Sequence, residues 1–92
     1  MVSTNPMYSI TFARSARKEL QKLDRKIAAR IFNRIENLLI DPRPSGCKKL
    51  KGQNLLWRIR ISDYRVVYSI NDNDRVIDII IIRHRNDVYD NL

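Results

Sequence analysis

Residues 55–70, LLWRIRISDYRVVYSI, decide the fold, because they read as two β-strands joined by a tight turn. Both runs are rich in β-branched and aromatic residues, and the Ser-Asp pair at 62–63 between them is typical of a turn. A two-residue loop pairs the flanking residues outward from the turn, so the second pair is Arg60 opposite Arg65. The stretch therefore predicts an antiparallel hairpin with two arginines directly across from each other.

The two faces of this hairpin differ in chemistry, because successive side chains of a strand point to opposite sides. One face is apolar or aromatic, and we expect it to be core. The other carries Arg58, Arg60 and Arg65 and is called the arginine face below. Like charges directly opposite each other destabilise a sheet, so these arginines either spread into water or share an anion. The guanidinium fork fits phosphate oxygens, which favours a phosphate site over a merely solvated face.

Composition agrees with an anionic partner. The chain has 92 residues, the length of one domain, and a net charge of +8 from 18 Lys or Arg against 10 Asp or Glu. Nucleic acid is the first candidate partner, followed by an acidic protein and an anionic membrane surface; a merely basic surface is the alternative. The single cysteine and single histidine exclude an internal disulfide and a Cys/His metal site.

Neither a signal peptide nor a membrane span is visible in the sequence, so we expect a cytoplasmic protein. We also expect a single domain over residues 7–92, preceded by a flexible extension at residues 1–6. No repeat and no linker divides the chain.

Working outward from the hairpin, the pattern predicts an α+β fold. Residues 7–12 alternate as a strand, 13–23 have helical spacing, and a second helix after Asp24 carries one apolar stripe. The two prolines of DPRPSG at 41–46 end that helix. Three strands follow, at about 54–61, 64–70 and 75–82, and the order β-α-α-β-β-β predicts an antiparallel meander with two helices on one face.

The register of the last strand is open. A four-residue loop, NDND at 71–74, places Ile80, Ile82 and His84 on the arginine face, whereas an odd loop places Ile81 and Arg83 there. Either register brings a basic or titratable group to the edge of the arginine face.

The chain resembles the RelE/ParE toxin superfamily of bacterial and archaeal toxin–antitoxin modules. The resemblance rests on KKLKG at 48–52, LWRIRISDYRVVYSI at 56–70 and RHRNDVY at 83–89, and it covers about residues 7 to 90. It implies a compact RelE-like sheet with two N-terminal helices and a short C-terminal helix. In the RelE branch it implies a metal-free endoribonuclease that cuts mRNA in the ribosomal A site, with the ribose 2′-hydroxyl attacking the adjacent phosphate.

By position in the family pattern, the resemblance also implies roles for individual residues. Arg65 corresponds to a transition-state stabiliser, Arg83 to the arginine before the tail and Tyr89 to the tyrosine that stacks near the cut nucleotide. The implied catalytic residues are Arg58, Arg60, Arg65, Arg83, His84 and Tyr89. The basic residues that precede the hairpin, Lys48, Lys49 and Lys51, are expected to bind RNA.

Arg58 and Arg60 stand where RelE-like enzymes often have lysines. Arginine stays protonated at neutral pH and cannot act as a general base, so another group must accept the proton. His84 is the first candidate, because its unperturbed pKa is near 6.5, and Lys49 or Lys51 is the reserve.

The resemblance implies three partners: mRNA, the ribosome and an acidic, RelB-like antitoxin that covers the basic surface in a toxin–antitoxin hetero-oligomer. The alternative function is a ParE-like toxin that inhibits DNA gyrase on the same fold. A non-catalytic RNA-binding module is a third possibility, but it lacks the exposed aromatics that stack single-stranded bases.

Overall fold

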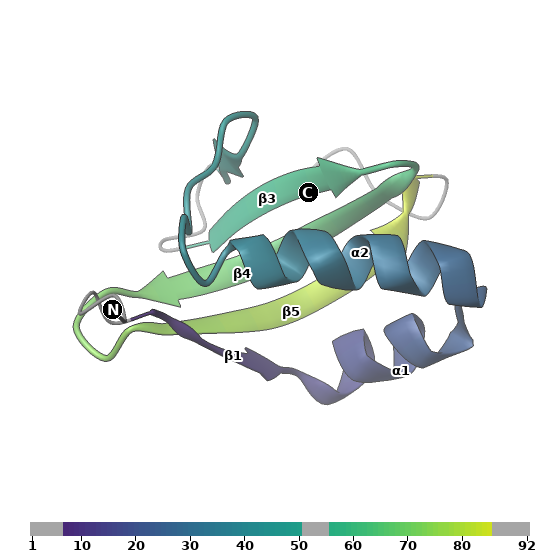
Figure 1. Cartoon of the computed structure of the whole chain (residues 1–92), viewed down its shortest axis with the longest axis horizontal. Coiled ribbons are helices and arrows are strands. Elements are labelled where there is room, and N and C mark those ends of the chain that lie inside the picture. Colours follow the sequence, from purple (N-terminus) through teal and green to yellow (C-terminus); the bar gives the residue numbers. More distant parts are fainter. Residues whose placement is uncertain (1–6, 51–55, 86–92) are drawn as a thin grey trace, which may run out of the picture.

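The computed structural model describes residues 7–50 and 56–85. They form two helices and one five-stranded sheet in the order β1 (Ser9–Phe12), α1 (Arg14–Lys22), α2 (Arg25–Asn37), β2 (Lys48–Lys49), β3 (Leu56–Ile61), β4 (Tyr64–Asn71) and β5 (Val76–His84). The helices lie together on one face of the sheet (Figure 1). This confirms the α+β class. The expected N-terminal extension and C-terminal helix lie outside the described residues.

The sheet is mixed, which corrects the expectation of a purely antiparallel meander. Its strand order is β1-β5-β4-β3-β2, and β1 runs parallel to β5 at one edge. The meander of β3, β4 and β5 is antiparallel as predicted, and the additional strand β2 pairs with β3. Strands β1 and β5 lie near opposite ends of the sequence, so no local turn between them indicates their pairing. Parallel strands need a long connection of this kind, because a tight turn can join only antiparallel strands.

The two helices bury their apolar sides against the sheet. Asp24 begins α2 as its N-cap, because its carboxylate accepts a hydrogen bond of 3.1 Å from the Lys26 backbone amide. Ile31 and Ile35, one turn apart on α2, are completely buried. They pack in one cluster with the inward side chains of the sheet: Ile59, Ile61, Val66, Tyr68, Ile70, Ile77, Ile79 and Ile82. The arginine face is therefore the side of the sheet that the helices leave uncovered.

A β-bulge decides the register of β5. Asn71 lies opposite Val76 across a four-residue turn at 72–75, which has the predicted length but starts one residue later than the predicted loop at 71–74. In addition, the pairing shifts by one residue between Val67 and Tyr68. Ile80 has no partner on β4 in this register, and its carbonyl accepts a hydrogen bond of 3.4 Å from the Ser15 hydroxyl of α1. The extra residue reverses the alternation on the outer half of β5. The structure therefore has the odd register, although the loop itself has the even length.

A polar clamp ties the loop after α2 to the turn between β4 and β5. The Arg43 guanidinium donates to the Asp72 carboxylate at 2.9 Å, and the Tyr8 hydroxyl donates to the same carboxylate at 2.6 Å. Arg43 also stacks over the Trp57 ring, 5.2 Å from its centroid. These contacts fix the start of the loop that leads to β2.

The clamp predicts an acid-sensitive contribution to stability. The hydrogen bond from Arg43, followed by that from Tyr8, lowers the pKa of Asp72 below its usual range. A carboxyl with a lowered folded-state pKa stabilises the fold above its unfolded pKa, and this contribution disappears as the pH falls through the folded pKa. We expect Asp72→Asn to lower the urea midpoint at pH 7. The fall of the urea midpoint between pH 5 and pH 2 should also be smaller in this variant than in the wild type. If the urea midpoints of the wild type and of Asp72→Asn fell equally as the pH is lowered, this prediction would be contradicted.

Tyr68 holds the same loop from inside the core. Its ring is completely buried, and its hydroxyl donates a hydrogen bond of 2.7 Å to the Pro42 carbonyl. Burial, with a smaller effect of the Cys47 thiol, raises the pKa of Tyr68, so the phenol stays protonated and keeps donating. Tyr68→Phe leaves that carbonyl without its donor and is expected to cost about 1–2 kcal/mol of unfolding free energy. Urea unfolding measures this, and an unchanged midpoint would show that water replaces the hydroxyl.

Within the described ranges, no helix is long and apolar enough to span a bilayer.

Candidate phosphate-binding site

The pairing of the central strands aligns three arginines in one row. Arg60 of β3 lies opposite Arg65 of β4, as predicted, and Arg65 lies opposite Arg83 of β5. Residues directly opposite in an antiparallel pair share a face, so the row crosses three strands on the side away from the helices. Arg58 lies two residues from Arg60 on the same strand and therefore on the same face. The bulge thus brings Arg83 into the arginine face.

The arginine face has an apolar floor beside its charges. Val67 lies opposite both Arg58 and Ile81, so it points away from the helices, and yet it is only 2% exposed. Arg58 is half-buried next to it. Burial, and then the charges of Arg60 and Arg65, lower the pKa of Arg58. A cation held under these conditions gains from a bound anion, because the anion offsets both the lost hydration and the repulsion.

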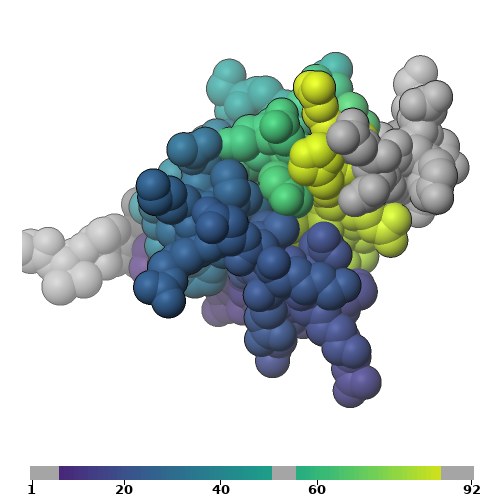
Figure 2. All heavy atoms as spheres, turned by 90° about the vertical axis from the view of Figure 1, so that its right-hand side faces the viewer, coloured from purple at the N-terminus to yellow at the C-terminus, as the bar shows by residue number. Residues whose placement is uncertain are grey.

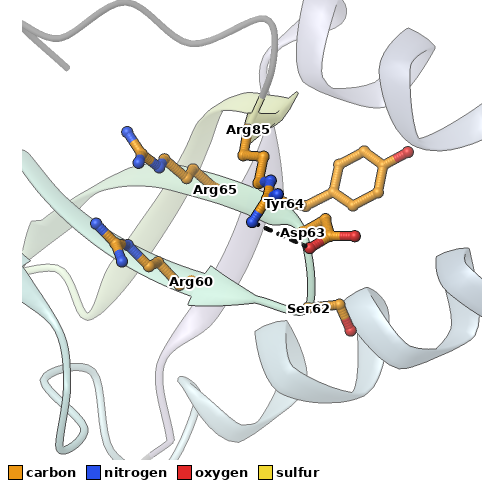
Figure 3. Close-up of a pocket in the computed structure, with 6 residues that line it drawn as sticks. All are labelled: Arg60, Ser62, Asp63, Tyr64, Arg65 and Arg85. Atoms are coloured by element: carbon orange, nitrogen blue, oxygen red, sulfur yellow. Dashed lines mark ion pairs between the residues drawn. The ribbon is translucent and has the colours of Figure 1, made fainter.

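A small hollow opens at the turn between β3 and β4. It has a volume of about 130 Å³ and is lined by Arg60, Ser62, Asp63, Tyr64, Arg65 and Arg85. In Figure 3 the side chains of Arg60 and Arg65 extend side by side, while Arg85 turns back toward Asp63. The hollow is smaller than the roughly 300–1,000 Å³ of ordinary small-molecule sites. It therefore suits one charged group of a larger ligand that lies along the sheet.

Arg85 is a member of the site that the sequence reasoning did not select. Its backbone amide donates to the Asp63 carbonyl at 2.7 Å, which extends the β4–β5 pairing beyond Arg83. Its guanidinium lies 3.9 Å from the Asp63 carboxylate, with both side chains about two-thirds exposed. A pair this exposed contributes little to stability, so Arg85 can turn to another anion at small cost. The signal was present, because Arg85 follows Arg83 by two residues and so shares its face.

The two described lysines of the predicted RNA-binding group point to different sides of the sheet. Lys48 lies opposite Arg58 and joins the arginine face, whereas Lys49 lies opposite Trp57 and belongs to the other side. Both side chains are exposed. The third lysine of this group, Lys51, lies outside the described residues, as does the predicted catalytic Tyr89.

His84 does not join the arginines. It lies opposite Tyr64, one residue beyond the row, and the alternation of β5 therefore turns it toward the helix side. Its ring meets the Tyr64 ring edge to face, with 5.1 Å between the centroids. Tyr64 in turn points away from the arginine pair in Figure 3. In this arrangement the imidazole and the arginines lie on opposite faces of the sheet.

Among the described residues, no three His, Cys, Asp or Glu side chains lie close enough together to hold a metal ion. The chemistry that the arrangement offers is that of fixed positive charge: four arginines on one sheet face, a fifth at its end and one carboxylate, that of Asp63, in the hollow.

The fold, a mixed five-stranded sheet with two helices on one face, is shared with solved toxin structures. The family model described as "ParE toxin of type II toxin-antitoxin system, parDE" matches residues 10–89. The chain therefore belongs to the RelE/ParE toxin superfamily and is a RelE-family toxin of a toxin–antitoxin system.

Individual relatives are RelE toxins. Toxin RelE of Mycobacterium tuberculosis is 33% identical over 89 residues, which cover 96% of this chain and 92% of the relative. The archaeal RelE–RelB complex from Pyrococcus horikoshii has a TM-score of 0.78 at 31% identity, covering 89% of this chain and 99% of the solved one. The isolated RelE toxin of Escherichia coli has a TM-score of 0.74 at 28% identity, and the match covers 84% of this chain and 83% of the solved one.

Proposed function

We propose that this toxin is an endoribonuclease that cuts mRNA in the ribosomal A site and so inhibits translation in the cytoplasm. The observation that carries the proposal is the row of Arg60, Arg65 and Arg83 on the uncovered face of the sheet. Guanidinium groups at these positions can bind the phosphate to be cut and the phosphates beside it. The relatives named RelE support the assignment of this row to RNA.

The proposed reaction needs no water molecule as the nucleophile. The ribose 2′-oxygen forms a bond to the adjacent phosphorus, and the bond from phosphorus to the 5′-oxygen of the next nucleotide breaks. A base takes the 2′-hydroxyl proton, and the leaving 5′-oxygen gains one. The products are a 2′,3′-cyclic phosphate and a 5′-hydroxyl end.

The arginines act on the charge that develops at the phosphorane. Arg65 is at the centre of the row, between Arg60 and Arg83, and we assign it the main stabilising role. Arg58 and Lys48 lie along the same face and would hold the neighbouring phosphates. Tyr89 keeps its proposed role of stacking on a base next to the cut. Guanidinium charge here takes the part that a metal ion plays in many other nucleases.

The natural inhibitor would be an acidic antitoxin. Several of the similar solved structures hold a toxin with its antitoxin, among them the RelE–RelB complex from Pyrococcus horikoshii and the RelBE toxin–antitoxin complex of Escherichia coli. We propose that this chain likewise binds a RelB-like partner whose acidic, partly disordered segment folds over the arginine face. Aspartate and glutamate side chains of the partner would then occupy the sites of RNA phosphates.

A ParE-like inhibition of DNA gyrase is the second candidate, because the family model that matches this chain is described as ParE toxin. The two activities separate in two assays. We expect the protein to stop in vitro translation, with new mRNA 5′-hydroxyl ends inside the codon that occupies the A site. We also expect gyrase supercoiling to be unaffected at the same protein concentration. Lost supercoiling with intact mRNA would replace the nuclease by the gyrase inhibitor.

A further inference from the structure

The two helices, which cover the face of the sheet opposite the arginine face, carry a second cluster of positive charge; one member, Arg30, reaches Ser62 at the hollow. Residues 14–37 contain eight Lys or Arg and three Asp or Glu. Six of these cations form two regular stripes, defined here as the helix stripes: Arg14, Lys18 and Lys22 on α1, and Lys26, Arg30 and Arg34 on α2. All six side chains are exposed.

The spacing of the helix stripes works against the stability of the helices. Residues four apart are neighbours on a helix surface, about 6 Å apart along the axis, and like charges there repel. Neither helix has an acidic residue in its first turn, where the positive end of the helix dipole disfavours cations. Of the six cations, Lys22 and Arg34 lie in the last turns of their helices, where the helix dipole favours a positive charge. An anionic partner would offset the repulsion along the stripes.

No cation of the helix stripes forms an ion pair within the described parts of the chain, although Glu19 lies one turn from Lys22 on α1. The ion pairs found there involve Arg43 and Arg85, neither of which lies on a helix. Arg30 donates a hydrogen bond of 2.9 Å to the neutral Ser62 hydroxyl, which leaves its charge uncompensated. Six cations on two rigid helices therefore present a fixed positive surface.

The chemistry around the helix stripes selects the kind of partner. A membrane would need an apolar helix face, but the apolar sides of both helices pack against the sheet. A protein interface would need buried anchors, and the exposed large apolar side chain on these described helices is Phe32 alone. Lysines and arginines without anchors fit a phosphate backbone. The near absence of aromatics argues against single-stranded RNA, whose bases stack on such side chains.

We infer that α1 and α2 form a second nucleic-acid surface that binds the phosphate backbone of base-paired RNA. Seen from the hairpin end, the helices form one side of the molecule and the ends of β4 and β5 another (Figure 2). A single-stranded segment on the arginine face and an RNA duplex on the helices can therefore be bound at the same time. The inference goes beyond the proposed cleavage, since backbone binding by the helices requires no reaction at the arginine face.

The test measures binding of the full chain to a short blunt-ended RNA duplex by fluorescence anisotropy over a range of salt concentrations. The helix variant is Lys18→Gln/Lys26→Gln. The control is Arg75→Glu, which lowers the net charge by the same two units at an exposed turn outside both the helix stripes and the arginine face. We expect the helix variant to bind the duplex about tenfold more weakly and to reduce the salt slope by about two, one for each lost contact. The control should keep both values close to those of the wild type.

Thermal unfolding and a competing polyanion complete the test. Because glutamine removes a repulsion, the helix variant should unfold at the same temperature as the wild type or higher, which excludes misfolding as the cause of weaker binding. Wild-type affinity and salt slope in the helix variant would overturn the inference, as would equal losses in the helix variant and the control. Loss of polyglutamate binding with duplex binding intact would also overturn it, in favour of an acidic protein partner.

Discussion

The Arg65→Ala variant is expected to cleave mRNA about 10²–10³-fold more slowly than the wild type, the usual effect of removing one preorganised donor from a transition state. Arg65 is flanked across the sheet by Arg60 and Arg83, so a phosphate held by this row must meet it. The rate is measured from mapped mRNA ends in a translation mixture. Arg65→Lys keeps the charge but loses the two-pronged guanidinium donor, so its cleavage rate should lie between those of the wild type and Arg65→Ala.

Thermal stability separates this functional effect from a structural one. Removing Arg65 relieves its repulsion with two opposite arginines, so the variant should melt no lower than the wild type. Arg75→Ala is the matched control, because Arg75 is an exposed arginine of the turn between β4 and β5, outside the arginine face. Wild-type cleavage by a folded Arg65→Ala protein would remove this residue from the site. If Arg75→Ala slowed cleavage as much as Arg65→Ala, the effect would come from the lower net charge and not from the position of Arg65.

How far the sequence predicts this site depends on how local each contact is. The Ser-Asp turn set the pairing of Arg60 with Arg65, because a two-residue loop leaves one register. The register of β5 was open because the run Ile79–Ile82 is apolar throughout, so its alternation has no signature. The bulge at Ile80, where the Ser15 hydroxyl of α1 meets the strand, decides it through tertiary structure.

The edges of the sheet were harder to predict for the same reason. The parallel pairing of β1 with β5 joins segments separated by more than sixty residues, for example Ile10 with Ile77, and no turn between them announces it. The two-residue strand Lys48–Lys49 is too short to show a period. Its pairing with β3 nevertheless decides which of the two lysines reaches the arginine face.

The position of His84 reopens the question of the proton acceptor. Its ring lies edge-on to Tyr64 on the helix side, so it would have to turn around the end of β5 to reach a ribose on the arginine face. Asp63 lies in the hollow that Arg60, Arg65 and Arg85 also line (Figure 3). Its ion pair with Arg85 is long and exposed, so the carboxylate remains accessible to a ligand. We therefore propose Asp63 as the base, because its carboxylate is an acceptor among the residues that line the hollow.

Asp63→Asn should accordingly slow cleavage by about 10²-fold or more, the range found when a general base is removed. Because an amide cannot accept the proton, the limb of the pH–rate profile that reports the base should disappear as well. His84→Gln is the matched variant and should keep both the rate and the profile. A faster or tighter-binding Asp63→Asn protein would instead identify Asp63 as a counter-ion that the RNA must displace. If only His84→Gln altered the pH–rate profile, the His84 imidazole would be the base. The end of β5 would then have to adopt another conformation when RNA is bound.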